Sequence, residues 1–108
     1  EAEAAGEFYP PVSLEEAADQ YILIVELPGL KKEDVKITFT AGKLILSGEK
    51  KGKADAQKRN FVHYERDFGK FYRKFSIDGN IKENKISAEF HDGLLEIHLP
   101  KEKTTPEK

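Results

Sequence analysis

The chain has 108 residues and a mass of 12.3 kDa, which suits a single domain with one core. Its 18 basic and 20 acidic side chains leave a formal net charge of −2, so no general attraction to nucleic acid or to anionic membranes is expected. The sequence contains no cysteine, which excludes disulfides, thiolate zinc sites and thiol catalysis. No apolar run approaches the roughly 20 residues that a membrane-spanning helix needs.

The two ends of the chain lack the pattern of a folded element. Residues 1–8 are acidic and rich in small side chains, and we interpret them either as the remnant of a processed secretion leader or as a natural acidic tail. Residues 101–108 carry no large apolar side chain, so we expect a disordered tail. The expected folded unit is therefore residues 9–100.

Apolar and polar side chains alternate with a period of two within this unit, which is typical of β-strands. In chain order we expect strands at 21–27, 35–40, 44–47, 61–65, 71–77, 86–91 and 95–99, and short helical turns at 14–17, 31–34 and 81–84. The uninterrupted apolar run at 21–27 predicts a strand buried on both faces. Ala41-Gly42 and Asp92-Gly93 predict tight turns. Seven or eight short strands together predict an all-β, immunoglobulin-like antiparallel β-sandwich.

The segment 49–59 is long for a hairpin loop and holds five basic and two acidic residues. It contains no aromatic side chain on which a nucleic-acid base could stack, so we interpret it as a solvated loop. The histidines, His63, His91 and His98, fall on separate expected strands or turns, and their spacing matches no metal signature. No serine lies in a nucleophile-elbow motif. We therefore expect no enzyme site, no metal and no cofactor.

One charge falls among apolar positions. Arg73 shares a strand face with Phe71, Phe75 and Ile77 by the period of two. A buried guanidinium needs a carboxylate partner, because an unpaired buried charge costs about 3–5 kcal/mol. Alternatively, the side chain extends past the sheet edge into water. The pattern by itself does not decide between these two arrangements.

Three segments resemble the α-crystallin domain of small heat-shock proteins. Residues 25–37 contain the Leu-Pro-Gly stretch of bacterial, archaeal and plant members, and residues 65–75 are similar to the family's Glu-Arg-x-x-Gly-x-Phe-x-Arg-x-Phe. Residues 88–95 match Ala-x-x-x-Asn-Gly-x-Leu, with Asp92 at the usual asparagine. The resemblance implies a cytoplasmic, ATP-independent chaperone that keeps unfolding client proteins in solution, with no cofactor.

The same resemblance implies a homodimer formed by reciprocal strand exchange. An arm at about residues 50–66 carries the strand 61–65, which pairs with the first strand of a second subunit, and Arg73 is expected to meet Glu65 across the interface. The expected dimer residues are Val12, Leu14, Phe61, Val62, His63, Tyr64, Glu65 and Arg73. The family also binds Ile-x-Ile/Val tails in an apolar groove, and the candidates here are Ile37, Phe39, Leu44, Leu46, Ile86, Ala88 and Leu94.

Two departures limit what the resemblance implies. The sequence shows neither the apolar N-terminal arm usual in the family nor an Ile-x-Ile/Val tripeptide in residues 101–108, so we expect an excised domain or a short member. Two alternatives stay open, namely a p23-like co-chaperone and an immunoglobulin-like adhesion module. Both alternatives predict a monomer of about 12 kDa, whereas the chaperone predicts a dimer.

Overall fold

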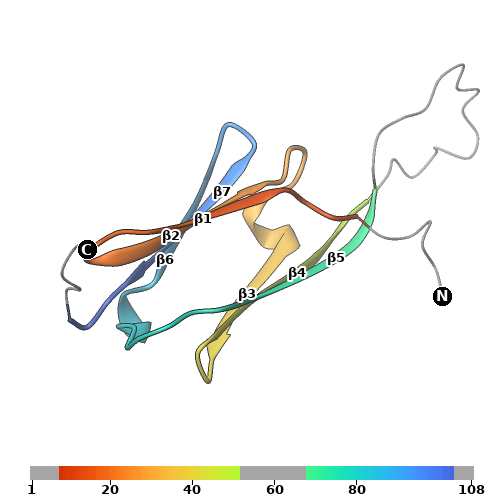
Figure 1. Cartoon of the computed structure of the whole chain (residues 1–108). Coiled ribbons are helices and arrows are strands. Elements are labelled where there is room, and N and C mark those ends of the chain that lie inside the picture. Colours follow the sequence, from red (N-terminus) through yellow and green to blue (C-terminus); the bar gives the residue numbers. More distant parts are fainter. Residues whose placement is uncertain (1–7, 52–67, 104–108) are drawn as a thin grey trace, which may run out of the picture.

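The computed structural model describes residues 8–51 and 68–103, which form two packed antiparallel sheets (Figure 1). One sheet has the strand order β1-β2-β7-β6 and the other the order β3-β4-β5. The strands are β1 (Val12–Glu16), β2 (Gln20–Glu26), β3 (Val35–Thr40), β4 (Lys43–Lys50), β5 (Gly69–Ser76), β6 (Ser87–His91) and β7 (Leu94–Pro100). The all-β sandwich expected from the sequence is thus confirmed, while the strand expected at 61–65 lies outside the described residues.

The core lies between the sheets, where the central strands contribute every second side chain. The fully buried members from β2, β4 and β7 are Leu23, Val25, Leu44, Leu46, Leu95, Ile97 and Leu99. Removing each from water contributes roughly 1.5–3 kcal/mol. On the outer face of β2, Ile22 and Ile24 are only half-buried. The prediction that this strand is buried on both faces is therefore wrong, because no further layer within residues 8–51 and 68–103 covers the outer side of the sheet.

Two hairpin turns have the residues that their backbone requires. Ala41 and Gly42 have φ values of 52° and 75°, and Asp92 and Gly93 have values of 53° and 76°. Positive φ at both central positions suits the right-handed twist of the flanking strands. The second turn sets the register of β6 against β7, in which Glu89 lies opposite Glu96.

Two of the expected helical turns are present and one is not. Single 3₁₀ turns occur at η2 (Lys32–Asp34) and η4 (Glu83–Lys85). The prediction of a helical turn at residues 14–17 is wrong, because most of this segment belongs to strand β1 and pairs with β2. Among the described residues, no helix is long and apolar enough to cross a membrane.

The folded part extends slightly beyond the expected limits of 9–100. The ring of Phe8 is buried and meets Phe71 edge-on, with the ring centroids 6.0 Å apart. The Phe8 N–H also donates to the Lys70 carbonyl at 2.8 Å. At the other end, Lys101 is buried and forms a β-bridge with Ile81. Both residues were expected in disordered segments, and both are ordered by backbone pairing that local composition does not reveal.

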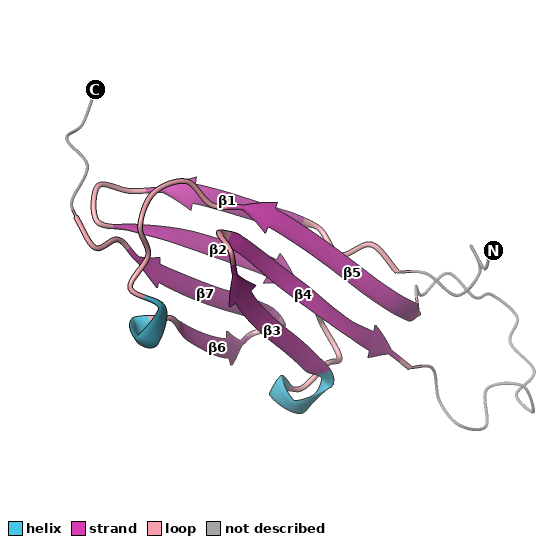
Figure 2. Cartoon of the chain, turned by 90° about the horizontal axis from the view of Figure 1, so that it is seen from below, coloured by secondary structure: helices cyan, strands magenta, loops and turns pink. Residues whose placement is uncertain are grey.

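The two sheets place their edge strands in pairs. Figure 2 shows β1 near β5 on one side of the sandwich, and β6 and β3 on the opposite side. The segment that enters β1 contacts β5 directly, because Arg73 donates a hydrogen bond to the Pro10 carbonyl at 2.9 Å. Of the expected dimer residues, Val12, Leu14 and Arg73 lie on the first pair of edges. Of the expected groove residues, Ile37, Phe39 and Ala88 lie on the second pair, and Ile86 immediately precedes β6.

Candidate protein-binding surfaces

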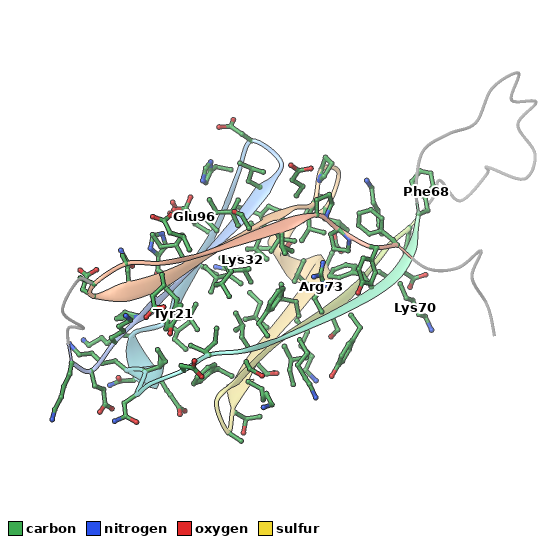
Figure 3. The ribbon with its side chains drawn as sticks, in the orientation of Figure 1. Tyr21, Lys32, Phe68, Lys70, Arg73 and Glu96 are labelled. Atoms are coloured by element: carbon green, nitrogen blue, oxygen red, sulfur yellow. The ribbon has the colours of Figure 1, made fainter. Side chains whose placement is uncertain are left out.

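Arg73 lies on β5 with its side chain directed between the sheets (Figure 3). Its register partner on β4 is the fully buried Leu46, so the guanidinium projects from an apolar face. The side chain is half-buried and lies over two aromatic rings, 4.6 Å from the Tyr9 ring centroid and 5.2 Å from that of Phe75. Such cation–π contacts contribute about 0.5–2 kcal/mol each.

The guanidinium of Arg73 has one polar contact among the described residues. Its Nη1 donates to the Pro10 carbonyl oxygen, and no carboxylate within residues 8–51 and 68–103 forms an ion pair with it. A carbonyl and two rings reduce the cost of burying this charge but do not neutralise it. The pairing with Glu65 remains a prediction, because Glu65 lies outside the described residues.

The neighbouring strand β1 is an edge of its sheet. Val12 packs against the core, whereas Leu14 is 40% exposed although it faces the same side as the buried Leu23. Within the described part of the chain, β1 pairs only with β2. An edge strand with an exposed leucine is a template for pairing with another chain. The other expected dimer residues, 61–65, lie outside the described residues.

The second pair of edges, β3 and β6, carries partly covered apolar side chains. Four of the groove candidates are half-buried and pack against the core, namely Ile37, Phe39, Ile86 and Ala88. Phe90 has the same environment and continues the alternation of Ile86 and Ala88, so the period of two adds it to the groove candidates.

The structure places the remaining three groove candidates elsewhere. Leu44 and Leu46 have no exposed surface, because β4 is the central strand of its sheet. Leu94 on β7 is the register partner of His91 and lies on the outer face of the sheet β1-β2-β7-β6. These three leucines are therefore removed from the candidate groove, which narrows to Ile37, Phe39, Ile86, Ala88 and Phe90.

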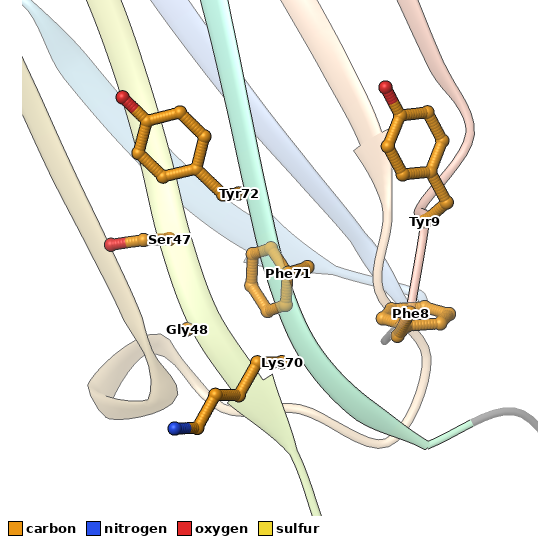
Figure 4. Close-up of a pocket in the computed structure, with 7 residues that line it drawn as sticks. All are labelled: Phe8, Tyr9, Ser47, Gly48, Lys70, Phe71 and Tyr72. Carbon is orange, nitrogen blue, oxygen red and sulfur yellow. The ribbon is translucent and has the colours of Figure 1, made fainter. Parts of the chain in front are cut away.

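A shallow cavity of about 400 Å³ lies near the N-terminal end of β5 (Figure 4). Its lining residues are Phe8, Tyr9, Ser47, Gly48, Lys70, Phe71 and Tyr72. Gly48 is required here, because a Cβ would lie 2.8 Å from Phe71 Cζ and closer still to the Asp34 carbonyl oxygen. Among the described residues that line it, Lys70 is the one charged side chain, and none of them form a pair suited to acid–base or nucleophilic chemistry. The cavity adjoins Arg73 through Tyr9, whose ring contacts the guanidinium.

These features define a β-sandwich whose recognisable surfaces are open strand edges and apolar side chains, which is the architecture of a protein-binding module. The model of the Hsp20/alpha crystallin family matches residues 13–108. Heat shock protein 16 of Schizosaccharomyces pombe is 41% identical over 98 residues, covering 89% of this chain and 68% of that protein. The 17.3 kDa class II heat shock protein of Solanum peruvianum is 36% identical over 92 residues, covering 84% and 59%.

Solved structures agree with this match. The structure of heat shock protein 16.0 from Schizosaccharomyces pombe has a TM-score of 0.87 at 37% identity and covers 94% of both chains. A small heat-shock protein from Xylella fastidiosa gives 0.79 at 31% identity, covering 92% of both. The chain belongs to the Hsp20/alpha crystallin family of small heat-shock proteins, which are non-enzymatic chaperones. It spans about 59–68% of the length of the first curated relatives that it matches.

Proposed function

We propose that this chain is an ATP-independent holdase domain that dimerises by reciprocal strand exchange and binds partly unfolded proteins. Family membership supports the chaperone class over a p23-like co-chaperone or an adhesion module. The observation that carries the dimer is Arg73, a half-buried cation beside the open edge of β1 with no carboxylate partner among the described residues. In the proposed dimer, the partner's 61–65 strand pairs with β1 and its Glu65 supplies that carboxylate.

Strand exchange has two physical advantages for this fold. It covers an edge that otherwise invites aggregation, and it gives Arg73 a charge partner in a site shielded from water. Because each subunit gives a strand and receives one, the interface is isologous and closes at two subunits. Deleting residues 52–66 should therefore yield a monomer or an aggregate, measured as molar mass by light scattering. A deletion variant that remains a dimer of unchanged stability contradicts strand exchange.

We propose that the half-buried apolar side chains of β3 and β6 line a groove for extended peptides, including client segments and Ile-x-Ile/Val tails of other subunits. Its apolar side chains are partly exposed along two edge strands, and an extended peptide can add its backbone to such an edge while alternate side chains enter the groove. The exposed charges Lys36 on β3 and Glu89 on β6 alternate with these apolar side chains and point away from the core. An apolar surface with a polar rim is typical of an interaction site.

A matched pair of substitutions on β6 tests the groove. Ala88 faces the groove and Ser87 faces the opposite side of the sheet, so Ala88→Glu introduces a charge into the groove and Ser87→Glu introduces the same charge outside it. We expect Ala88→Glu to weaken binding of a labelled Ile-x-Ile peptide by about tenfold or more. Ser87→Glu should leave the affinity within about twofold. Backbone amide shifts confined to residues 50–59, or equal weakening by both variants, contradict the groove.

The chaperone activity is tested by light scattering from a heat-labile client enzyme. The 108-residue chain should reduce aggregation without ATP, and Ala88→Glu should reduce this protection more than Ser87→Glu. A circular dichroism melt of each variant separates loss of binding from loss of fold. Protection that requires ATP, or no protection at any ratio of chain to client, would exclude the holdase.

A further inference from the structure

The outer face of the sheet β1-β2-β7-β6 carries a cluster of histidine and glutamate side chains on the side remote from the groove. It arises from two Glu-x-His segments, Glu89-Phe90-His91 on β6 and Glu96-Ile97-His98 on β7. The period of two directs the charged members of both segments away from the core, whereas Ile97 points into it. Antiparallel register then sets Glu89 opposite Glu96 and places the two histidines at opposite diagonals. Figure 3 shows Glu96 on this outer side.

Glu96 is the centre of the cluster. Its Oε1 lies 3.0 Å from His91 Nε2, and its Oε2 lies 2.8 Å from His98 Nε2. The ring of His98 is held from its other side, because its Nδ1 lies 2.9 Å from Gln20 Oε1 on β2. Three strands thus fix the orientation of one carboxylate, and both its oxygens face imidazole nitrogens.

The electrostatics of the cluster favour a cation between the strands. Two carboxylates directly opposite each other repel, and Asp92 adds a third, with Oδ2 3.6 Å from His91 Nδ1. The Oε1 of Glu96 lies 3.0 Å from His91 Nε2, so the imidazole has carboxylate oxygens near both of its nitrogens. Positive charge at this position is therefore stabilised by the carboxylates around it.

The donor atoms also fit a metal ion. One ligand atom each from Glu89, His91 and Glu96 lies within 4.8 Å of the others. Ligands held at about 2.0–2.2 Å from zinc in a tetrahedral site are about 3.4 Å apart, so small rotamer changes on the exposed Glu89 and His91 suffice to reach it. The ion would replace the proton that His91 Nε2 shares with Glu96. Oxygen and imidazole donors together suit zinc-like transition ions better than Ca²⁺ or Mg²⁺.

We propose that Glu89, His91 and Glu96 form a binding site for Zn²⁺ or a similar divalent transition ion on the outer face of the sheet. His98 is a positioning residue, which holds the second oxygen of Glu96 and is itself held by Gln20. Such support of a ligating carboxylate changes metal affinity by about 10- to 100-fold in known sites. The fourth position faces solvent and accepts water. The bound ion would connect the edge strand β6 to the central strand β7.

Titration of the untagged, metal-free 108-residue chain with Zn²⁺ tests the site, with binding measured by calorimetry and His91 ring shifts by NMR. We expect one site per chain, and His91→Gln and Glu96→Gln each to weaken it by about tenfold or more. Glu83→Gln, which removes an exposed carboxylate on η4, is the matched control and should change affinity by less than about twofold. His98→Gln should weaken binding less than His91→Gln while leaving the stoichiometry unchanged.

Three results would overturn the proposal. These are no saturable Zn²⁺ binding, equal affinity for Ca²⁺ or Mg²⁺, or unchanged Zn²⁺ affinity in both His91→Gln and Glu96→Gln. The melting temperature of each variant without metal shows whether it folds. Where Glu96→Gln alone fails to fold, His91→Gln decides, because His91 is exposed and does not contribute to the core.

Discussion

A cationic side chain lies at each end of strand β1, but the two cations have different contact partners. At the end of β1, Lys101 Nζ lies 2.8 Å from Glu16 Oε2 and 5.1 Å from the Tyr21 ring centroid, with 5% of its side chain exposed. Before its start, Arg73 contacts a carbonyl and two rings, without a carboxylate among the described residues. One charge is neutralised within the chain, and the other remains beside an open edge. This difference supports a partner at the Arg73 end.

Among the substitutions that test this comparison, Arg73→Ala should have the largest effect on the stability of the dimer. If Arg73 pairs with Glu65 of a second subunit, removing it leaves a shielded carboxylate and should cost the dimer about 3–5 kcal/mol. The measurement is chemical denaturation at several chain concentrations. Lys74→Ala, an exposed neighbour on the opposite face of β5, is the control and should cost less than about 0.5 kcal/mol.

A double-mutant cycle then distinguishes pairing from packing. Arg73→Ala, Glu65→Ala and the double variant should show a coupling energy above about 1 kcal/mol. If Arg73→Ala lowers the stability of the dimer by less than about 1 kcal/mol, Arg73 makes only a surface contact. If the cycle also shows no coupling energy, Arg73 and Glu65 do not pair across the interface.

Gly48→Ala disturbs the Arg73 end without changing a charge. Gly48 is the register partner of Phe71, and its new Cβ would displace the Phe71 ring and the backbone near Asp34. We expect a loss of about 1–3 kcal/mol in the free energy of unfolding, because the backbone on one side cannot move freely. Thermal and urea denaturation measure it, with Ser47→Ala as the neighbouring control. Equal stability of Gly48→Ala and the original chain would show that the strand relaxes at this point.

Lys101→Met tests the other end of β1. Methionine retains an apolar side chain of similar length and removes the ion pair with Glu16, whose side chain is 53% exposed. Because solvent screens one partner, we expect a loss of only about 1 kcal/mol in the stability of the subunit. The dimer dissociation constant should change by less than about twofold. Weakening of the dimer to the extent expected for Arg73→Ala would show that both ends of β1 depend on the partner.

Tyr21→Phe should have the smallest effect, and only at high pH. Burial, followed by the negative charge of Glu16, raises the pKa of Tyr21 above its usual 10.0. The neutral phenol is favoured in the folded chain, so its contribution to stability is complete below about pH 10 and decreases as the pH rises through the raised pKa. Urea midpoints between pH 9 and about pH 11 should therefore fall more steeply for the original chain than for Tyr21→Phe. Parallel curves contradict this assignment.

Local sequence predicted the elements whose signals are contained within a few residues. The period of two in Val35–Thr40 and Leu94–Pro100 predicted strands, and Asp92-Gly93 predicted a turn that its positive φ values confirm. The charged and small residues of the segment 14–17 favour a helical turn locally. Pairing with β2 overrides that preference, since backbone hydrogen bonds to a buried strand outweigh a weak propensity.

The composition of this chain by itself determined that it is a small domain without thiol chemistry, and its alternation determined a β-sandwich. Which charges meet was decided only by register and by the packing of two sheets. The sequence places Lys101 in a charged tail, but in the fold it is buried against Tyr21 from β2 and Glu16 from β1. Glu89 and Glu96 are seven positions apart and become opposite neighbours through one two-residue turn. Side-chain chemistry of this kind depends on distances between strands, and distances along the chain do not specify them.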